Sequence, residues 1–289
     1  MADRIEYIIF YGFSVIFKIL GLKLSRKFST VLAFIFYFII PIRKNTTIDN
    51  LSRAFPEYNS KNIRKIAFGS YKSFAITLIE ILYLPWMKYG EAYKATKCTN
   101  INLVKSKYAE NKGLILLSAH FGNWEFMAIS IALQSGMPFS LVVKAQRNPY
   151  VTGWLNTVRS KWGNKIVPLG ISIRQIYKEL KDRNIVAMVA DQRGPSEGVK
   201  VNFFGRKAAV YSGPTVLALK TGAPILYGIS IRQPDNTYVS EFQEISMDNL
   251  PEDYEDKVSE INQRLTDYLE NIIRKYPEQW LWMHKRWKY

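Results

Sequence analysis

Two side chains that could do acid–base chemistry, His120 and Glu125, lie five positions apart in the chain. A carboxylate on one imidazole nitrogen would hold the ring in one tautomer, and the other nitrogen could then take a proton from a hydroxyl group. The chain has only two histidines, so a mechanism that needs an imidazole base must use His120 or His284. The spacing alone is weak evidence, because a packed histidine at a strand end beside a helix-start glutamate gives the same pattern.

The elements expected around His120 favour a functional position. The apolar run 114–118 is typical of a buried strand, and residues 123–133 have the pattern of a helix. Strand ends in α/β sheets open into crevices where ligands bind. Gly122 allows a tight turn and Asn123 can cap the helix, which places Glu125 in the first helical turn, where the helix dipole favours a carboxylate.

The other reactive side chains favour structural roles. Cys98 lies in a polar stretch away from any paired histidine, so we do not expect it to act as a nucleophile. A single cysteine cannot form an internal disulfide, which fits a reducing compartment, and it excludes zinc sites built on several cysteines. His284 stands among Trp280, Trp282 and Trp287, which indicates packing or seating at an interface.

The order of elements predicts an α/β fold, with a single mixed sheet flanked by helices. Residues 1–95 read as helical, with a polar link over 43–51 and a helix from 61 to 84 that Ser60 would cap. After a polar stretch at 91–112, apolar strand patterns alternate with helical ones. Strands are expected at 114–118, 139–143, 165–168, 185–190, 223–231 and 238–245, the last two as a hairpin. Helices are expected at 123–133, 148–162, 172–182, 211–221 and 253–276.

The N-terminus is apolar but interrupted by charges. The first run, 5–24, contains Glu6, Lys18 and Lys23, and the second run, 28–42, is uncharged but short. A full membrane span needs roughly 20 apolar residues. Three readings stay open: a short or tilted anchor, amphipathic helices in the membrane interface, or ordinary core helices. We divide the chain into a membrane-associating segment, 1–45, and a catalytic domain, 46–289.

The charge balance calls for an anionic partner. Lysine and arginine number 40 against 24 acidic residues, a formal net charge of +16. Nucleic acid, anionic lipid, a phosphorylated substrate or an acidic carrier protein would each suit this charge. The sequence has no zinc-finger spacing, basic-zipper pattern or aromatic RNA-binding box, so nucleic acid is not expected. A non-catalytic basic protein that binds membrane or nucleic acid is the alternative from another class.

Several motifs resemble one family. Leu117–Glu125 (Leu-Ser-Ala-His-Phe-Gly-Asn-Trp-Glu) resembles the His-x4-Asp/Glu box of the lysophospholipid acyltransferase superfamily and, more closely, that of the late acyltransferases of lipid A synthesis. The resemblance runs nearly end to end and in the right order. Its other boxes are Asn50-Leu51 with Ala54–Pro56, Ala190–Gln192, Phe203–Arg206, Thr221–Pro224 and Pro277–Arg286.

The resemblance implies a fold like that of the glycerolipid acyltransferases and a mechanism. His120 would deprotonate an acceptor hydroxyl, Glu125 would orient His120, and the donor would be a thioester of acyl carrier protein, with no cofactor and no metal. In the family an arginine and the aspartate of the Asp-Gln pair help to build the site, which here indicates Arg159 and Asp191, with Arg147 next. Arg193, beside that aspartate, is a further candidate for substrate binding.

The resemblance also implies partners and a location. The acceptor would be an anionic glycolipid, a lipid A precursor, and the protein would contact lipid at the cytoplasmic face of the inner membrane. The motifs do not separate this acceptor from a glycolipid mannoside, a lysophospholipid or an aminolipid, because acceptor choice depends on pocket shape. The family's N-terminal membrane helix is usually longer than the apolar runs here.

Overall fold

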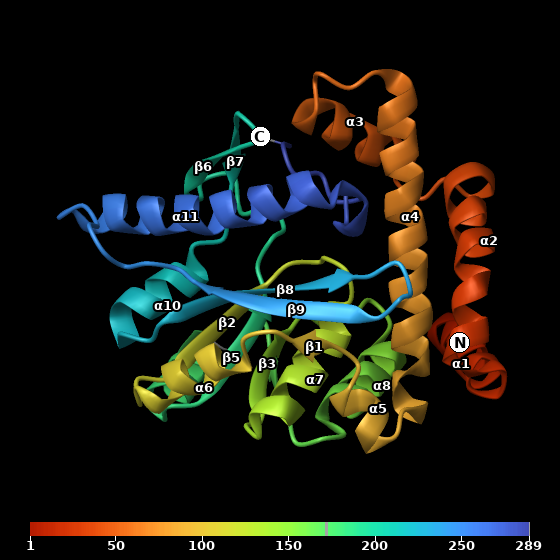
Figure 1. Cartoon of the computed structure of the whole chain (residues 1–289), viewed down its shortest axis with the longest axis horizontal. Coiled ribbons are helices and arrows are strands. Elements are labelled where there is room, and N and C mark those ends of the chain that lie inside the picture. The colour runs from red at the N-terminus through yellow and green to blue at the C-terminus, as the bar shows by residue number, and fades with distance from the viewer. Residues whose placement is uncertain (171–172, 289) are drawn as a thin grey trace.

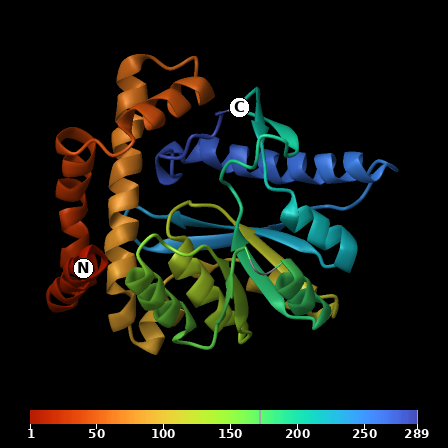
Figure 2. The ribbon, with the colours of Figure 1, turned by 180° about the vertical axis from the view of Figure 1, so that it is seen from behind.

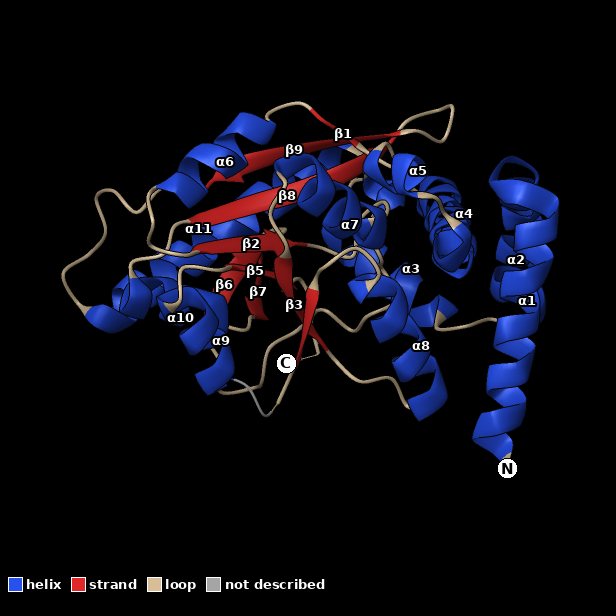
Figure 3. Cartoon of the chain, turned by 90° about the horizontal axis from the view of Figure 1, so that it is seen from below, coloured by secondary structure: helices blue, strands red, loops and turns tan. Residues whose placement is uncertain are grey.

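A seven-stranded mixed sheet forms the centre of the protein. The computed structural model describes residues 1–170 and 173–288. The strand order is β1-β9-β8-β2-β5-β3-β4; only the β8–β9 pair is antiparallel (Figures 1 and 3). The strands are β1 (Lys97–Cys98), β2 (Leu114–Ser118), β3 (Phe139–Val143), β4 (Lys165–Pro168), β5 (Ile185–Val189), β8 (Ile225–Arg232) and β9 (Tyr238–Glu244). The α/β fold and the 223–245 hairpin expected from the sequence are confirmed.

Helices cover both faces of this sheet. The side chains of β2 alternate between two cores: Ile115 and Leu117 pack in the cluster that includes α4, α9, α10 and α11, whereas Leu114 and Leu116 pack on the side of α7. A strand buried on both faces must be apolar throughout, which is why 114–118 reads as one apolar run. The helices are α3 (Lys44–Ala54), α4 (Ser60–Tyr83), α5 (Tyr89–Tyr93), α6 (Ile101–Ala109), α7 (Trp124–Ser135), α8 (Pro149–Ser160), α9 (Ile173–Lys181), α10 (Gly213–Thr221) and α11 (Tyr254–Lys275).

Two sequence expectations about helices were wrong. The stretch 43–51, expected as a polar link, lies mostly in α3, where Leu51 and Ala54 are fully or nearly fully buried. The cap of α4 is Asn59, whose side-chain oxygen accepts a hydrogen bond from the Asn62 amide, and Ser60 is the first helical residue. The helix expected at 172–182 corresponds to α9, Ile173–Lys181. Residue 172 lies outside the residues that the structure describes.

The N-terminal helices lie on the outer side of α4. They comprise α1 (Ala2–Ser25), η1 (Arg26–Phe28), α2 (Ser29–Phe34) and η2 (Ile35–Ile39). They form one flank of the molecule, seen from the front and from behind (Figures 1 and 2). Ala2–Ile39 and Ser60–Trp86 are long and apolar enough to cross a membrane by length and composition, and the second is largely buried in the protein. Ala33 and Tyr37 of this segment belong to the main core of the protein. The division of the chain into two parts at residue 45 stays a prediction.

A second, two-stranded sheet lies beside the end of the chain (Figure 2). It consists of β6 (Lys200–Phe203) and β7 (Arg206–Ala209), joined through Phe204 and Gly205, both with positive φ. Such a two-residue turn matches the twist of a hairpin. β6 packs on α11, and Phe203 packs on the C-terminal tryptophans Trp280 and Trp287.

Candidate active site

The structure joins His120 to Asp191. His120 Nδ1 lies 2.7 Å from Asp191 Oδ1, and the His120 backbone amide donates to Asp191 Oδ2 at 2.9 Å. The Asp191 side chain is 3% exposed, whereas 23% of the His120 side chain stays exposed. The aspartate therefore fixes the ring from its buried side, and Nε2 is the nitrogen left for proton transfer.

Strand register brings these two residues together. β2 and β5 are parallel, and Ser118 pairs with Val189. His120 and Asp191 each lie two residues beyond that pair, so both emerge at the carboxyl edge of the sheet. This edge is where α/β proteins bind their ligands.

The turn after β2, residues 119–123, is fixed by close contacts, and we call it the histidine turn. Gly122 has φ +53°, and a Cβ built there would lie 1.9 Å from the Ser230 carbonyl oxygen. The Gly122 carbonyl accepts from the Thr77 hydroxyl at 2.7 Å. Asn123 caps α7 by accepting from the Phe126 amide at 2.8 Å, as expected from the sequence. Only glycine fits this approach of one backbone to another.

The C-terminal segment clamps the same turn. The Gly122 amide donates to the Gln279 carbonyl, and the Leu281 amide donates to the His120 carbonyl, each at 3.0 Å. The Trp280 indole donates to Asp191 Oδ2 at 2.8 Å. Sequence patterns did not reveal this role of Trp280, because its partner Asp191 lies 89 residues away.

Glu125 lies in the first turn of α7 but does not hold the His120 ring. Its two carboxylate oxygens accept hydrogen bonds from Arg159, one of them from Nε at 2.9 Å; Glu125 is buried and Arg159 is partly buried. The expectation that Glu125 orients His120 was wrong: the carboxylate that contacts Nδ1 of the His120 ring belongs to Asp191. The reason is that Arg159, on α8, forms a bidentate ion pair with the Glu125 carboxylate, whereas Asp191 lies within hydrogen-bond distance of His120 Nδ1.

Neighbouring charges shift the pKa values of His120 and Asp191. Burial disfavours the charged imidazole, but the Asp191 charge, its hydrogen bond and the Glu125 charge together raise the pKa of His120 above its ordinary value. Burial likewise opposes ionised Asp191, but the contacts with His120 and Trp280 hold the pKa of that carboxyl below its usual range. The pair thus favours the ionised aspartate and stabilises an imidazolium.

The other two predicted arginines have different surroundings. Arg147, just before α8, is 75% exposed and pairs with Glu6 and Asp3 of α1, so it ties that part of the chain to the N-terminal helix. Arg193 lies close enough to His284 for its charge to contribute to the lowered pKa of that imidazole, whose largest cause is burial. The His284 backbone carbonyl accepts from Asn50 at 2.6 Å, and the structural role of its imidazole stays a prediction.

A buried polar cluster beside the histidine turn went unrecognised in the sequence. Glu80 is fully buried and accepts hydrogen bonds from Arg26, Asn123 and Tyr238 at 2.5–2.7 Å. Arg232 donates to Ser73 and Thr77 of α4 and to the Tyr238 hydroxyl. The available signal was a single glutamate inside the apolar stretch 78–82.

A narrow pocket opens next to the imidazole. Its lining comes from α4, the histidine turn with Trp124, and the C-terminal segment: Ser70, Ser73, Phe74, Thr77, His120, Gly122, Trp124, Gln279, Trp280 and Leu281. Its volume is about 10 Å³, room for roughly one water molecule. The pocket gives His120 access to a small group such as a hydroxyl. Among residues 1–170 and 173–288, no three His, Cys, Asp or Glu side chains cluster as metal ligands would.

The fold and the site define an α/β protein with a histidine–carboxylate pair at the carboxyl edge of its sheet. The chain belongs to the bacterial lipid A biosynthesis acyltransferase family, whose sequence profile matches residues 3–289. It is thus a member of an acyltransferase family, and the resemblance seen in the motifs is confirmed.

Relatives of known name share about a quarter of their residues with the chain. It is 25% identical to the lipid A biosynthesis lauroyltransferase of Escherichia coli (strain K12) over 241 residues, covering 83% of this chain and 77% of the relative. It is 23% identical to the palmitoleoyltransferase of the same organism, covering 85% and 79%. It is 24% identical to the phosphatidylinositol mannoside acyltransferase of Mycolicibacterium smegmatis, covering 76% and 71%.

Proposed function

We propose that the protein transfers a fatty acyl chain from an acyl carrier protein thioester to a hydroxyl of a lipid A precursor, with His120 as the general base. The observation that carries the proposal is the His120–Asp191 pair beside a pocket at the sheet edge. Membership of the acyltransferase family supports the reaction class, and the lipid A relatives support the acceptor. No cofactor is required in this scheme. The proposed place of action is the cytoplasmic face of the inner membrane.

The proposed reaction needs one base and one leaving group. His120 Nε2 takes the proton of the acceptor hydroxyl as its oxygen attacks the thioester carbonyl carbon. The tetrahedral intermediate collapses, the carbon–sulfur bond breaks, and the thiolate leaves with the proton from the imidazolium. Asp191 holds the tautomer and stabilises the imidazolium through Nδ1. Glu125 is paired with Arg159, and its charge also favours the imidazolium.

The test is acyl transfer by purified protein. Wild type and His120→Ala are incubated with acyl carrier protein thioester and a lipid A precursor, and the product is measured by mass spectrometry. We expect His120→Ala to be slower by about 100- to 10,000-fold, the usual contribution of a general base. Equal rates would refute the base assignment. Circular dichroism of both proteins shows whether the variant is folded.

A second acceptor has direct support from the comparisons. The mannoside acyltransferase relative is nearly as similar to the chain as the lauroyltransferase. Offering a phosphatidylinositol mannoside and a lipid A precursor in the same reaction decides between them. Preferential acylation of the mannoside would move the proposal to that acceptor and leave the chemistry of His120 unchanged.

A further inference from the structure

The segment 2–40, which we call the N-terminal platform, has an apolar outer side. On α1, Ile5, Ile9, Phe13 and Ile16 recur at helical spacing, and 48–56% of the surface of each is exposed. Beyond the α1 break, Leu24, Phe28, Val31, Phe34 and Phe38 continue the pattern with 43–58% exposed. An apolar stripe of this size on a soluble surface indicates a binding partner.

The inner side of the platform is fastened to the catalytic core. The Ser14 hydroxyl donates to the Leu82 carbonyl at 2.6 Å, and the Trp86 indole donates to the Ser14 carbonyl at 3.0 Å. Phe17 packs with Ile79 and Leu82 of α4. α1 could cross a bilayer only by breaking these contacts or by drawing α4 in with it.

The two helices of the platform run in different directions along one flank. The break lies at Gly21, with φ 72° and ψ 158°. In Figure 1, α2 stands upright beside α4 and α1 is seen nearly end-on, whereas in Figure 3 α1 is seen from the side on the same flank. Two helices laid out in this way share a surface, and they do not share a direction along which both could span a bilayer.

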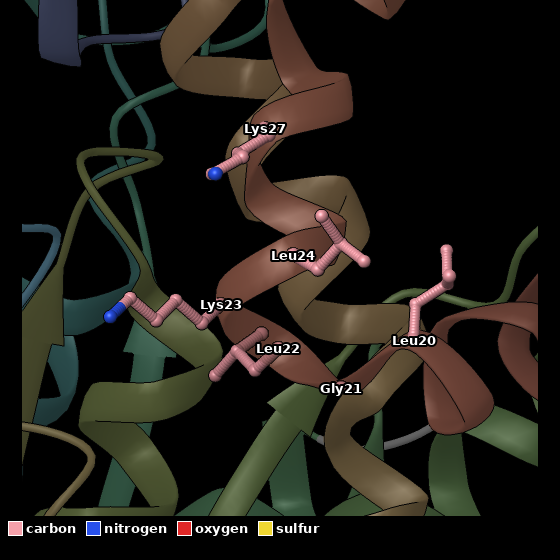
Figure 4. Close-up of a pocket in the computed structure, with 6 residues that line it drawn as sticks. All are labelled: Leu20, Gly21, Leu22, Lys23, Leu24 and Lys27. Atoms are coloured by element: carbon pink, nitrogen blue, oxygen red, sulfur yellow. The ribbon is translucent and has the colours of Figure 1, made fainter.

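Charge identifies the partner. Between Glu6 and Asp49 the chain has no acidic residue but six basic ones, Lys18, Lys23, Arg26, Lys27, Arg43 and Lys44, of which Arg26 is paired with the buried Glu80. At the joint, Lys23 and Lys27 extend to one side of a hollow of about 310 Å³ and Leu20 and Leu24 to the other (Figure 4). Apolar side chains with neighbouring lysines suit an anionic lipid surface, where the ammonium groups reach the headgroups.

We propose that the N-terminal platform docks flat on an anionic lipid bilayer and enters one leaflet along both helices without spanning it. This deepens the proposed function and rests on it only for the membrane-borne acceptor. α4 carries the platform on one side, through Ile79 and Leu82, and lines the His120 pocket on another, through Ser73 and Thr77. Docking therefore sets the pocket about one helix diameter, ~10 Å, from the platform.

Depth measurements test this docking. In a Cys98→Ser background, single cysteines at Ile9, Phe13, Ile16, Phe28 and Phe34 are labelled with an environment-sensitive fluorophore. Vesicles of phosphatidylglycerol and phosphatidylcholine carry bromine at different depths as a quencher. We expect all five labels at one shallow depth, about 5–10 Å into the leaflet. A Lys207→Cys label on β7 serves as the unquenched control.

Two results would overturn the proposal. Label depths that pass steadily through the bilayer centre along α1 would show a spanning helix. Absence of quenching at all five positions would show that the surface meets protein, a second copy or another chain, and not lipid.

Variants separate this proposal from the catalytic one. The double variant I16E/F34E should lower partition into the anionic vesicles at least tenfold, and the matched control Tyr211→Glu, at an exposed aromatic outside the platform, should not. His120→Ala should dock as wild type does. Undiminished transfer by His120→Ala, with docking retained, would count against the catalytic proposal alone. Unchanged partition of the double variant would count against the docking proposal alone.

Discussion

The hydrogen bond between Asp191 and His120 gives the strongest prediction at the scale of single residues. In Asp191→Asn the neutral amide neither stabilises an imidazolium nor fixes the same tautomer, so the base would be misprotonated in a site of intact shape. We expect kcat to fall by about 100- to 10,000-fold. Steady-state kinetics with the acyl carrier thioester measures this fall.

A matched control is Asp235→Asn in the exposed β8–β9 turn, where the carboxylate bonds only to Thr237 among the described residues. This variant should keep its activity within about twofold, since surface substitutions rarely disturb a site. If the two variants had the same kcat, Asp191 would have no orienting role.

The raised pKa of His120 has a kinetic consequence. A general base must be neutral to accept a proton, so activity should be lost on the acid side as the imidazole protonates. The Asp191 and Glu125 charges raise that pKa above the ordinary 6.5, so the acid limb should lie above pH 6.5. Glu125→Gln removes one of these charges and should move the limb to lower pH. A kcat/KM profile from pH 5 to 9 that does not move would contradict the electrostatic assignment.

The sequence identified the members of the site better than their partners. His120, Arg159 and Asp191 were marked by motif, but the pairing of His120 with Asp191 depends on the register of β2 against β5. Register is set by tertiary packing across 71 residues, which no local pattern records. Glu125 was paired with the nearer histidine because Arg159, 34 residues away, could not be placed on the same side.

At the scale of elements, Gly122 couples the histidine turn to β8. Gly122→Ala forces a Cβ into the Ser230 carbonyl at positive φ, so we expect it to cost about 2–5 kcal/mol of unfolding free energy. Gly136→Ala is the matched control: it also has positive φ, but nothing lies within 4 Å of its Cβ. The control should cost only about 1–2 kcal/mol, the conformational part. Urea unfolding compares them, and equal losses would show that the close approach is relieved.

Glu80 connects three elements through one buried carboxylate. It holds Arg26 at the platform joint, Asn123 in the histidine turn and Tyr238 on β9. Glu80→Gln should cost about 3 kcal/mol, since Arg26 and Arg232 would lose a buried counter-charge. Glu260→Gln removes an exposed pair on α11 and should stay within about 0.5 kcal/mol. Denaturant unfolding measures both variants. If they lost similar free energies of unfolding, the buried Glu80 carboxylate would contribute no more stability than an exposed ion pair.

Long apolar elements were predictable and short polar ones were not. The strands 114–118 and 185–190 and the hairpin at 223–245 were found because burial demands continuous apolar runs. α6 and β1 lie in a stretch that is polar in sequence, and β6 and β7 carry exposed lysine and arginine. Neither segment therefore shows a clear hydrophobic periodicity. Their positions follow from packing against the sheet and α11.

At the scale of the whole molecule, the proposed docking would draw on both the net charge of +16 and the apolar platform. The charge part is screened by salt, since the Debye length falls from about 10 Å at 0.1 M to about 3 Å at 1 M. The apolar part is not screened. Binding to phosphatidylglycerol-rich vesicles should therefore weaken at least tenfold between about 0.1 and 1 M sodium chloride, while the weaker binding to neutral phosphatidylcholine vesicles stays unchanged.

The depth of insertion should respond differently from the amount bound. Because the platform is fixed to α4 through Ser14 and Phe17, protein that remains bound at high salt should keep the same shallow label depth at Phe13 and Phe34. Vesicle flotation gives the bound fraction, and bromine quenching gives the depth at each salt concentration. Binding to anionic vesicles that ignores salt would mean that the basic residues face away from the headgroups. A depth that increases as the charge is screened would mean that electrostatic attraction, and not the packing on α4, holds the helices at the surface.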